Sequence, residues 1–228
     1  MPSYGRVRPI SEGNGMRNRV LLGIAALGLL AMIGVSASSG GMGPMRARTH
    51  SPTRPARAIL VFLPADVREG KIALRATRGN GSAAPARATT TDLVRTSLKM
   101  LFAYPSKPDE RHSKRMPTAV PPGVRVLGVD VQEKAITVNL SSQVLKYRSV
   151  EKFLPFSTMR DHSAQVLLAQ IVFTASEPSK DASVQVLVGG KKLRTHGKNS
   201  LDTSRPSGRQ DFRAGFLAED ESGRPIQF

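Results

Sequence analysis

The sequence of 228 residues contains no cysteine and no tryptophan, and its other aromatic residues are three tyrosines and eight phenylalanines. Without thiols the chain cannot form disulfides, thiolate metal centres or cysteine nucleophiles. Most of the phenylalanines lie in apolar runs, so few aromatic rings remain among the basic residues to stack on bases. We therefore expect no nucleic-acid partner.

Side chains for metal or acid–base chemistry are scattered along the chain. The four histidines stand far apart: His50, His112, His162 and His196. Their spacing matches no metal site, and no G-x-x-x-x-G-K-[ST] phosphate loop occurs. Asp161, His162 and Ser163 have the side-chain types of a catalytic triad, but three adjacent residues cannot converge on one another, so we interpret them as helix capping. We expect no metal, no cofactor and no enzymatic activity.

Positive charge is abundant and unevenly distributed. The formal net charge is +17, and residues 58–194 contain 21 Lys or Arg against 11 Asp or Glu. A field of this sign favours polyanions such as nucleic acid, anionic lipid headgroups or acidic wall polymers. Charge alone does not choose among them.

Residues 20–45 contain no ionisable side chain. A helix over the most apolar part, residues 20–35, would be about 24 Å long, and the small residues that follow can extend it toward the thickness of a bilayer core. Leu, Ile, Ala and Gly occupy every face, which is unlike a buried amphipathic helix. We interpret residues 20–37 as a transmembrane anchor or a signal peptide.

The flanking charges orient this segment. Residues 1–19 carry four arginines opposed by one glutamate, so the positive-inside rule keeps them in the cytoplasm and sends the rest of the chain outward. Val35-Ser36-Ala37 is acceptable to a signal peptidase, whereas the long uncharged stretch favours retention. We prefer an uncleaved, single-pass anchor in the cell membrane, with the bulk of the chain extracytoplasmic.

The segments on either side of the central region are polar. Residues 38–57 are rich in Gly, Pro, Ser and Arg, which predicts a flexible basic linker. Residues 195–228 are rich in Gly, Ser, Arg and Asp, which predicts a disordered tail with a little local structure around Phe212 and Phe216.

The central region, residues 58–194, shows strand and helix patterns. Strands are predicted at 58–64, 71–78, 124–132, 134–141 and 183–190, and helices at 93–104 and 164–176. Leu127, Val129 and Val131 should share one strand face, and Gln132-Glu133-Lys134 should form a hairpin turn despite lacking glycine. The helices do not alternate regularly with parallel strands. We therefore predict an α+β fold, a small mixed sheet of about five strands with two helices packed on one face.

Residues 105–123 contain five prolines and a basic cluster, so we expect an exposed loop. Its basic residues are candidates for partner binding: Lys107, Arg111, Lys114 and Arg115.

Four segments together resemble the GerMN domain of sporulation and germination proteins. They are "LKMLFAYPS" (98–106), "MPTAVPPGVRVLGVDVQEKAITVNLSSQV" (116–144), "LLAQIVFTASE" (167–177) and "SVQVLVGGKKL" (183–193), in the family's order. Lys134 replaces the usual hairpin glycine, and residues 105–116 are longer than is typical. Family-motif positions with a structural role are Pro121, Pro122, Gly123, Gln170 and Gly190. Pro-Pro-Gly would form a rigid lead-in to the hairpin, and Gln170 would satisfy a buried strand or loop carbonyl.

The resemblance implies an extracytoplasmic, membrane-tethered domain without catalytic residues, acting in cell-envelope assembly, peptidoglycan remodelling or sporulation. We expect an interaction module that binds a protein partner or an anionic wall polymer through a sheet edge or the basic loop. The alternative is an accessory enzyme or regulator of peptidoglycan hydrolysis.

Overall fold

The computed structural model describes residues 57–84, 87–105, 117–194 and 199–227. The strands are β1 (Arg57–Arg68), β2 (Lys71–Ala84), β3 (Val126–Gln132), β4 (Ala135–Leu140), β5 (Ser183–Val188) and β6 (Phe216–Glu219). The helices are α1 (Thr90–Ala103), α2 (Ser157–Asp161), α3 (Ser163–Ala175) and the short 3-10 helices η2 (Ser142–Ser149), η3 (Glu151–Phe153) and η4 (Arg209–Phe212).

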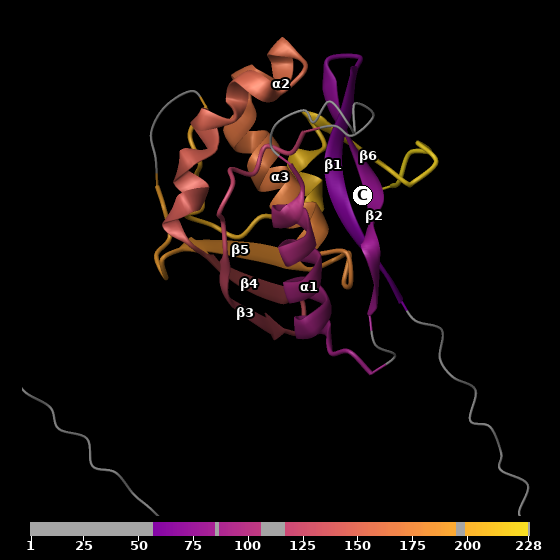
Figure 1. Ribbon diagram of the computed structural model, residues 1–228, viewed down its shortest axis with the longest axis vertical. Coiled ribbons are helices and arrows are strands. Elements are labelled where there is room, and N and C mark those ends of the chain that lie inside the picture. The colour runs from indigo at the N-terminus through magenta and orange to yellow at the C-terminus, as the bar shows by residue number, and fades with distance from the viewer. Residues whose placement is uncertain (1–56, 85–86, 106–116, 195–198, 228) are drawn as a thin grey trace, which may run out of the picture. The chain divides into compact units, whose positions relative to one another are not determined.

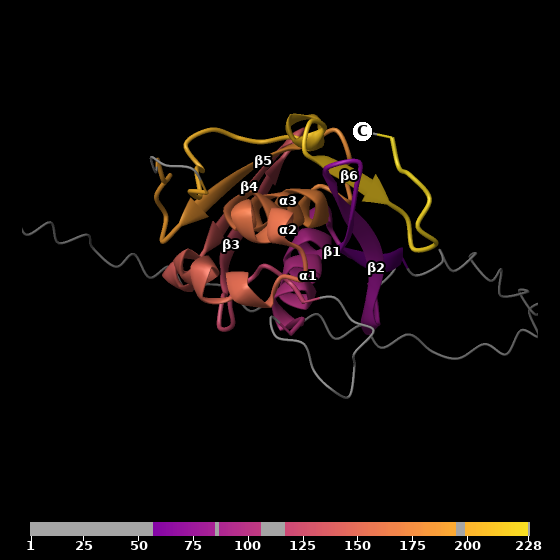
Figure 2. The ribbon, with the colours of Figure 1, turned by 90° about the horizontal axis from the view of Figure 1, so that it is seen from above.

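Six strands form two three-stranded sheets in the described residues. Sheet A has the order β1-β2-β6 and sheet B the order β3-β4-β5. Helices α1 and α3 lie between the two sheets, and both contact β1 (Figures 1 and 2). The predicted α+β class is confirmed. The prediction of one five-stranded sheet with both helices on one face is wrong, because the helices separate two sheets.

The β1–β2 hairpin is longer than the sequence pattern predicts. Its strands pair antiparallel from Arg57 opposite Ala84 to Arg68 opposite Lys71, and the turn places Glu69 and Gly70 at positive φ. Helix α1 follows, and it begins with a reciprocal capping box between Thr89 and Asp92.

Sheet B starts with the predicted β3–β4 hairpin, and β5 then pairs in parallel with β4. Ile136, Val138 and Leu140 alternate inward as the sequence predicts. Leu127 does not share the inner face with Val129, because a register shift between Val126 and Gly128 makes it the extra residue of a bulge. Its exposed fraction is 53%.

Glu133 in the β3–β4 turn has a φ of +46°. A residue with a Cβ is disfavoured there, and glycine is not. Replacing Glu133 with Gly should therefore raise the free energy of unfolding by about 1 kcal/mol. Denaturant unfolding followed by circular dichroism measures this change. The same replacement at Lys134, whose φ is not positive, should destabilise the protein; stabilisation by both would contradict the backbone explanation.

Residues 199–227 belong to the fold, so the prediction of a disordered tail is wrong for them. Strand β6 pairs in parallel with β2, from Ile72 opposite Phe216 to Arg75 opposite Glu219. Phe212 and Phe216 are buried and continue a chain of ring contacts that begins at Phe62 and Phe173. The local structure expected at these two phenylalanines is therefore part of the main core.

The predicted anchor, residues 20–37, lies outside the described residues, as do the cytoplasmic segment 1–19 and nearly all of the linker 38–57. Among the helices that the structure describes, none combines the length and the apolar character needed to cross a bilayer.

Candidate functional site

The candidate partner-binding residues Lys107, Arg111, Lys114 and Arg115 lie outside the described residues. The two ends of their loop are described and close together, because the backbone N–H of Thr118 donates to the carbonyl of Pro105 at 3.2 Å. A basic loop at these positions remains a prediction.

The Pro121-Pro122-Gly123 motif turns the chain into sheet B. Pro121 is buried, Pro122 is exposed, and Gly123 has a φ of +81°. Directly after it, the backbone N–H of Arg125 donates to the hydroxyl of Ser141, and the N–H of Ser141 donates to the carbonyl of Arg125. The motif therefore fixes where β3 starts against the end of β4.

Replacing Gly123 with Ala should destabilise the domain by about 1 kcal/mol, because the added Cβ is disfavoured at this φ. No described atom lies within 4 Å of the position that the new methyl carbon would occupy, so the effect should come from the backbone alone. Urea unfolding measures it. Gly215 has equally open surroundings without a positive φ, and Gly215→Ala should change stability far less.

Gln170 on α3 joins three parts of the chain. Its side chain is fully buried, donates from Nε2 to the carbonyl of Phe62 at 3.1 Å, and accepts from the N–H of Ala119 at 2.9 Å. The hydroxyl of Thr118 also donates to Oε1 at 3.3 Å. The amide therefore connects β1 to the segment that leads into Pro-Pro-Gly.

Thr174, one helical turn after Gln170, completes the same arrangement. Its hydroxyl accepts the N–H of Phe62 at 3.1 Å. Phe62 lies on β1, an edge strand, so both of its outward backbone groups are satisfied by side chains of α3. Pro64 shares this outward edge and lacks an N–H. Helix α3 thus occupies the edge of sheet A at which another strand would otherwise pair.

Gly190 belongs to the turn after β5. Gly189 and Gly190 have positive φ, and the N–H of Gly190 donates to the side-chain oxygen of Asn139 on β4 at 2.8 Å. The N–H of Gly189 donates to the carbonyl of Leu140. This turn is therefore held against the end of β4.

Arg209 was not found by sequence reasoning. Its exposed fraction is 4%, and its guanidinium donates to the carbonyl of Phe173, the hydroxyl of Ser176 and the carboxylate of Glu177. The guanidinium carbon also lies 5.2 Å from the ring centres of both Phe62 and Phe173. A cation at the carboxyl end of α3 complements the helix dipole. The nearby Phe212 and Phe216 were the only sign in the sequence that the segment around Arg209 could be ordered.

Glu219 on β6 is a second buried charge, with an exposed fraction of 2%. It pairs with Arg68 at 2.9 Å and with Arg75 at 2.9 Å. Arg75 lies on β2 beside β6, and Arg68 ends β1, so the carboxylate ties all three strands of sheet A together.

Two adjacent cavities, of about 330 Å³ and 460 Å³, share Ala58, Leu60 and Glu177 in their walls. The larger is also lined by Asp220, whose pKa is lowered mainly by the hydroxyl of Ser222 and then by the N–H of Arg224. These groups order a turn and leave the carboxylate ionised at neutral pH. Within the described ranges, no group of three or more His, Asp or Glu is placed to hold a metal ion.

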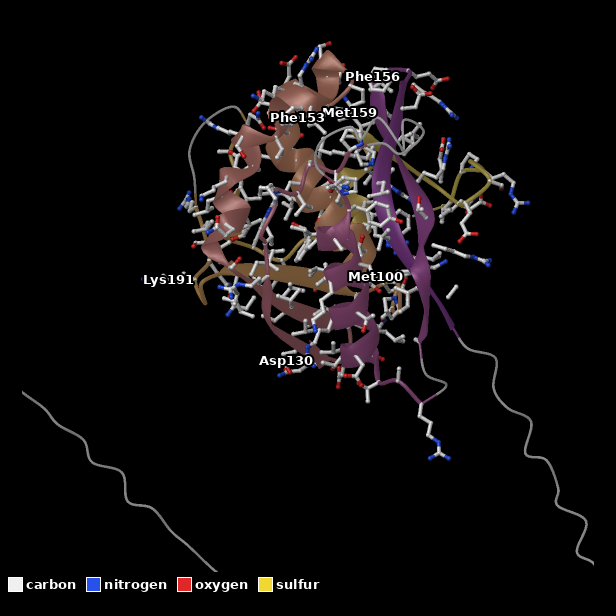
Figure 3. The ribbon with its side chains drawn as sticks, viewed as in Figure 1. Met100, Asp130, Phe153, Phe156, Met159 and Lys191 are labelled. Atoms are coloured by element: carbon white, nitrogen blue, oxygen red, sulfur yellow. The ribbon has the colours of Figure 1, made fainter. Side chains whose placement is uncertain are left out.

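A basic surface lies where strands β4 and β5 end. Val126 pairs with Leu140, and Leu140 pairs with Val188, so the segments before β3, after β4 and after β5 meet there. We call this surface the basic end of sheet B; its exposed basic residues are Arg125, Lys146, Arg148, Lys191, Lys192 and Arg194. None of these six side chains lies within 4 Å of a carboxylate among the described residues. Figure 3 shows Lys191 at this end and Asp130 farther along β3.

Comparisons with known proteins identify a family. The model of the family "Germane: Sporulation and spore germination" matches residues 66–194. Among curated proteins, none matches this chain. A solved structure of a candidate lipoprotein from Clostridium perfringens is 15% identical, with 70% of this chain and 91% of that chain covered and a TM-score of 0.39.

The tandem GerMN domains of the sporulation protein GerM from Bacillus subtilis are 10% identical, with 69% of this chain and 48% of that chain covered and a TM-score of 0.42. The family model covers more than half of the sequence and agrees with the resemblance seen in residues 58–194. The chain belongs to the Germane family of sporulation and spore germination proteins and contains a GerMN-like domain.

Proposed function

We propose that this chain is a membrane-anchored envelope protein whose GerMN-like domain is a non-enzymatic interaction module outside the cytoplasm. Residues 20–37 would hold it in the cell membrane, and residues 38–57 would form the basic linker. The domain would act in envelope assembly, peptidoglycan remodelling or sporulation, by binding a protein partner or an anionic wall polymer.

The proposal rests on the groups that the buried polar side chains contact. Gln170 and Thr174 satisfy the backbone of β1, Arg209 caps α3, and Glu219 ties the strands of sheet A. A catalytic group must present a polar atom to a substrate, whereas each of these side chains directs its polar atoms at other parts of the fold. Recognition by the exposed surface is the function that this arrangement supports best.

Incubation with labelled peptidoglycan separates this proposal from an accessory hydrolase. The purified protein should sediment with the polymer and release no soluble fragments over many hours. Release of soluble fragments at the same rate by the protein and by a surface variant such as Lys191→Glu would contradict a binding-only role. That result would favour the enzymatic alternative.

Salt dependence tests the part of the proposal that concerns an anionic wall polymer. Exposed charges interact over a screening length of about 10 Å at 0.1 M salt and about 3 Å at 1 M. Sedimentation with wall material should therefore weaken steeply across this range. Binding to wall material that does not change with salt would contradict recognition by charge.

A further inference from the structure

The basic end of sheet B also carries exposed apolar side chains. Two large hydrophobic residues are exposed in the part of the chain that the structure describes: Leu127 at 53% and Leu145 at 45%. Leu127 is the bulged second residue of β3, beside Arg125 and the pair of Val126 with Leu140. Leu145 lies in η2, three residues after its start, or about 6 Å along a 3-10 helix.

Topology brings these features together. Strand β3 begins, and β4 and β5 end, at this edge of sheet B, and η2 follows β4 after one residue. Figure 1 shows η2 rising from the end at which β5 gives way to its turn. The segments that carry the six cations and both leucines therefore meet at one end of sheet B, although the sequence spreads these residues from 125 to 194.

The backbone beneath this surface is held in place. Asn139 holds the N–H of Gly190, and Arg125 and Ser141 exchange two hydrogen bonds. Tyr147 is buried and donates its hydroxyl to the carbonyl of Asn199 at 2.9 Å, which fixes η2. The leucines are therefore presented from an ordered support.

We propose that the folded domain docks on the anionic face of the lipid bilayer through the basic end of sheet B, with Leu127 and Leu145 entering the headgroup region. Cations around exposed leucines are the combination that an anionic lipid surface recognises. A wall polymer would use the charges and leave the leucines in water.

This inference rests on the proposed function, because the anchor would hold the domain close to the membrane. A flexible linker of 20 residues has a root-mean-square length of roughly 25 Å, so the domain would stay within reach of the bilayer. Each Lys or Arg near an anionic surface strengthens binding about fivefold, so loss of three should weaken docking by about 100-fold.

The absence of cysteine allows a site-specific test on the full chain. Ser142→Cys, in η2, and Gln132→Cys, at the opposite end of β3, each place one spin label at an exposed position. The labelled chains are inserted into lipid nanodiscs of phosphatidylcholine, with or without phosphatidylglycerol. Collision with a soluble nickel complex then reports whether each label is in water or against lipid.

The label at residue 142 should be protected in discs that contain phosphatidylglycerol and accessible in neutral discs, with residue 132 accessible in both. Protection should disappear with Lys146→Glu, Lys191→Glu and Lys192→Glu combined. It should persist with Lys99→Glu, Lys134→Glu and Lys180→Glu, which make the same charge change at other exposed lysines. Leu127→Ser combined with Leu145→Ser should weaken docking on the anionic discs, as measured by protection of the label at residue 142, about tenfold.

An inserted chain whose residue 142 stays accessible in anionic discs would overturn the docking inference and leave the anchor proposal standing. Protection in neutral discs on addition of poly(glycerol phosphate), without protection by anionic lipid, would assign the surface to a wall polymer and also overturn it. A chain that fails to insert would defeat the anchor proposal. Docking would then be measured by sedimentation of the protein with vesicles of the same lipids. No binding to anionic vesicles would overturn the docking inference. Binding that is lost when Lys146→Glu, Lys191→Glu and Lys192→Glu are combined would support it.

Discussion

Replacing Arg209 with Ala should lower the free energy of unfolding by about 3–4 kcal/mol. The variant loses the donors to the carbonyl of Phe173 and the hydroxyl of Ser176, both at 2.9 Å, and leaves Glu177 without its cation. It also leaves the rings of Phe62 and Phe173 without the guanidinium that contacts both of them. Guanidinium chloride unfolding followed by circular dichroism measures the change.

Arg205 is the matched control because it is exposed and lies in the same segment. Arg205→Ala should change stability by no more than about 0.5 kcal/mol. Equal effects at the two positions would show that Arg209 does not act through its buried contacts. A chain that ends at residue 198 should lose cooperative unfolding, because it also lacks Phe212, Phe216 and strand β6.

Replacing Gln170 with Leu should cost about 3–4 kcal/mol, although the side chains are similar in size. The carbonyl of Phe62 and the N–H of Ala119 would then be buried without partners. Each unsatisfied group of this kind costs about 1–3 kcal/mol. Thermal and denaturant unfolding of the variant, compared at equal protein concentration, measure the loss.

Gln165 provides the control for Gln170, since it lies on the exposed face of the same helix. Gln165→Ala should be close to neutral. Thr174→Val should cost about 1–2 kcal/mol, because it removes one acceptor from the N–H of Phe62. A loss below 1 kcal/mol for Gln170→Leu would mean that the helix does not hold the edge of β1.

Alternation along the strands was sufficient to predict much of sheet B. Val184, Val186 and Val188 point inward in β5 as their spacing indicates, and they pair with β4 in parallel. Leu127 broke the pattern because a bulge adds one residue, and alternation contains no signal for a bulge. The division into two sheets depends on side chains of α3 that bind an edge of β1, which is a contact across 108 and 112 residues.

The tail could not be placed from its composition. Leu201, Phe212, Phe216 and Ala218 are its buried apolar residues, and polar residues and glycines separate them. Their burial depends on an existing surface of α3 and β2, so local pattern underestimates their order. Gln170 was expected to satisfy a buried strand or loop carbonyl, and its amide donates to the carbonyl of Phe62, but no local pattern identifies a partner 108 residues away.

The basic end of sheet B could not be predicted from the sequence either. Lys191 and Lys192 are adjacent in the sequence, but Arg125 and Lys146 join them only through the pairing of β3, β4 and β5. The predicted basic loop at Lys107, Arg111, Lys114 and Arg115 lies outside the described residues.

Cell fractionation followed by intact-mass measurement tests the proposed membrane anchorage most directly. The protein should be found in the membrane fraction, resist washing with high salt, and have a mass that shows residues 1–37 to be retained. A protein shortened by residues 1–37 and released outside the cell would replace the anchor with a signal peptide. A full-length protein that is free in the cytosol would contradict the proposed compartment, and with it the envelope partners.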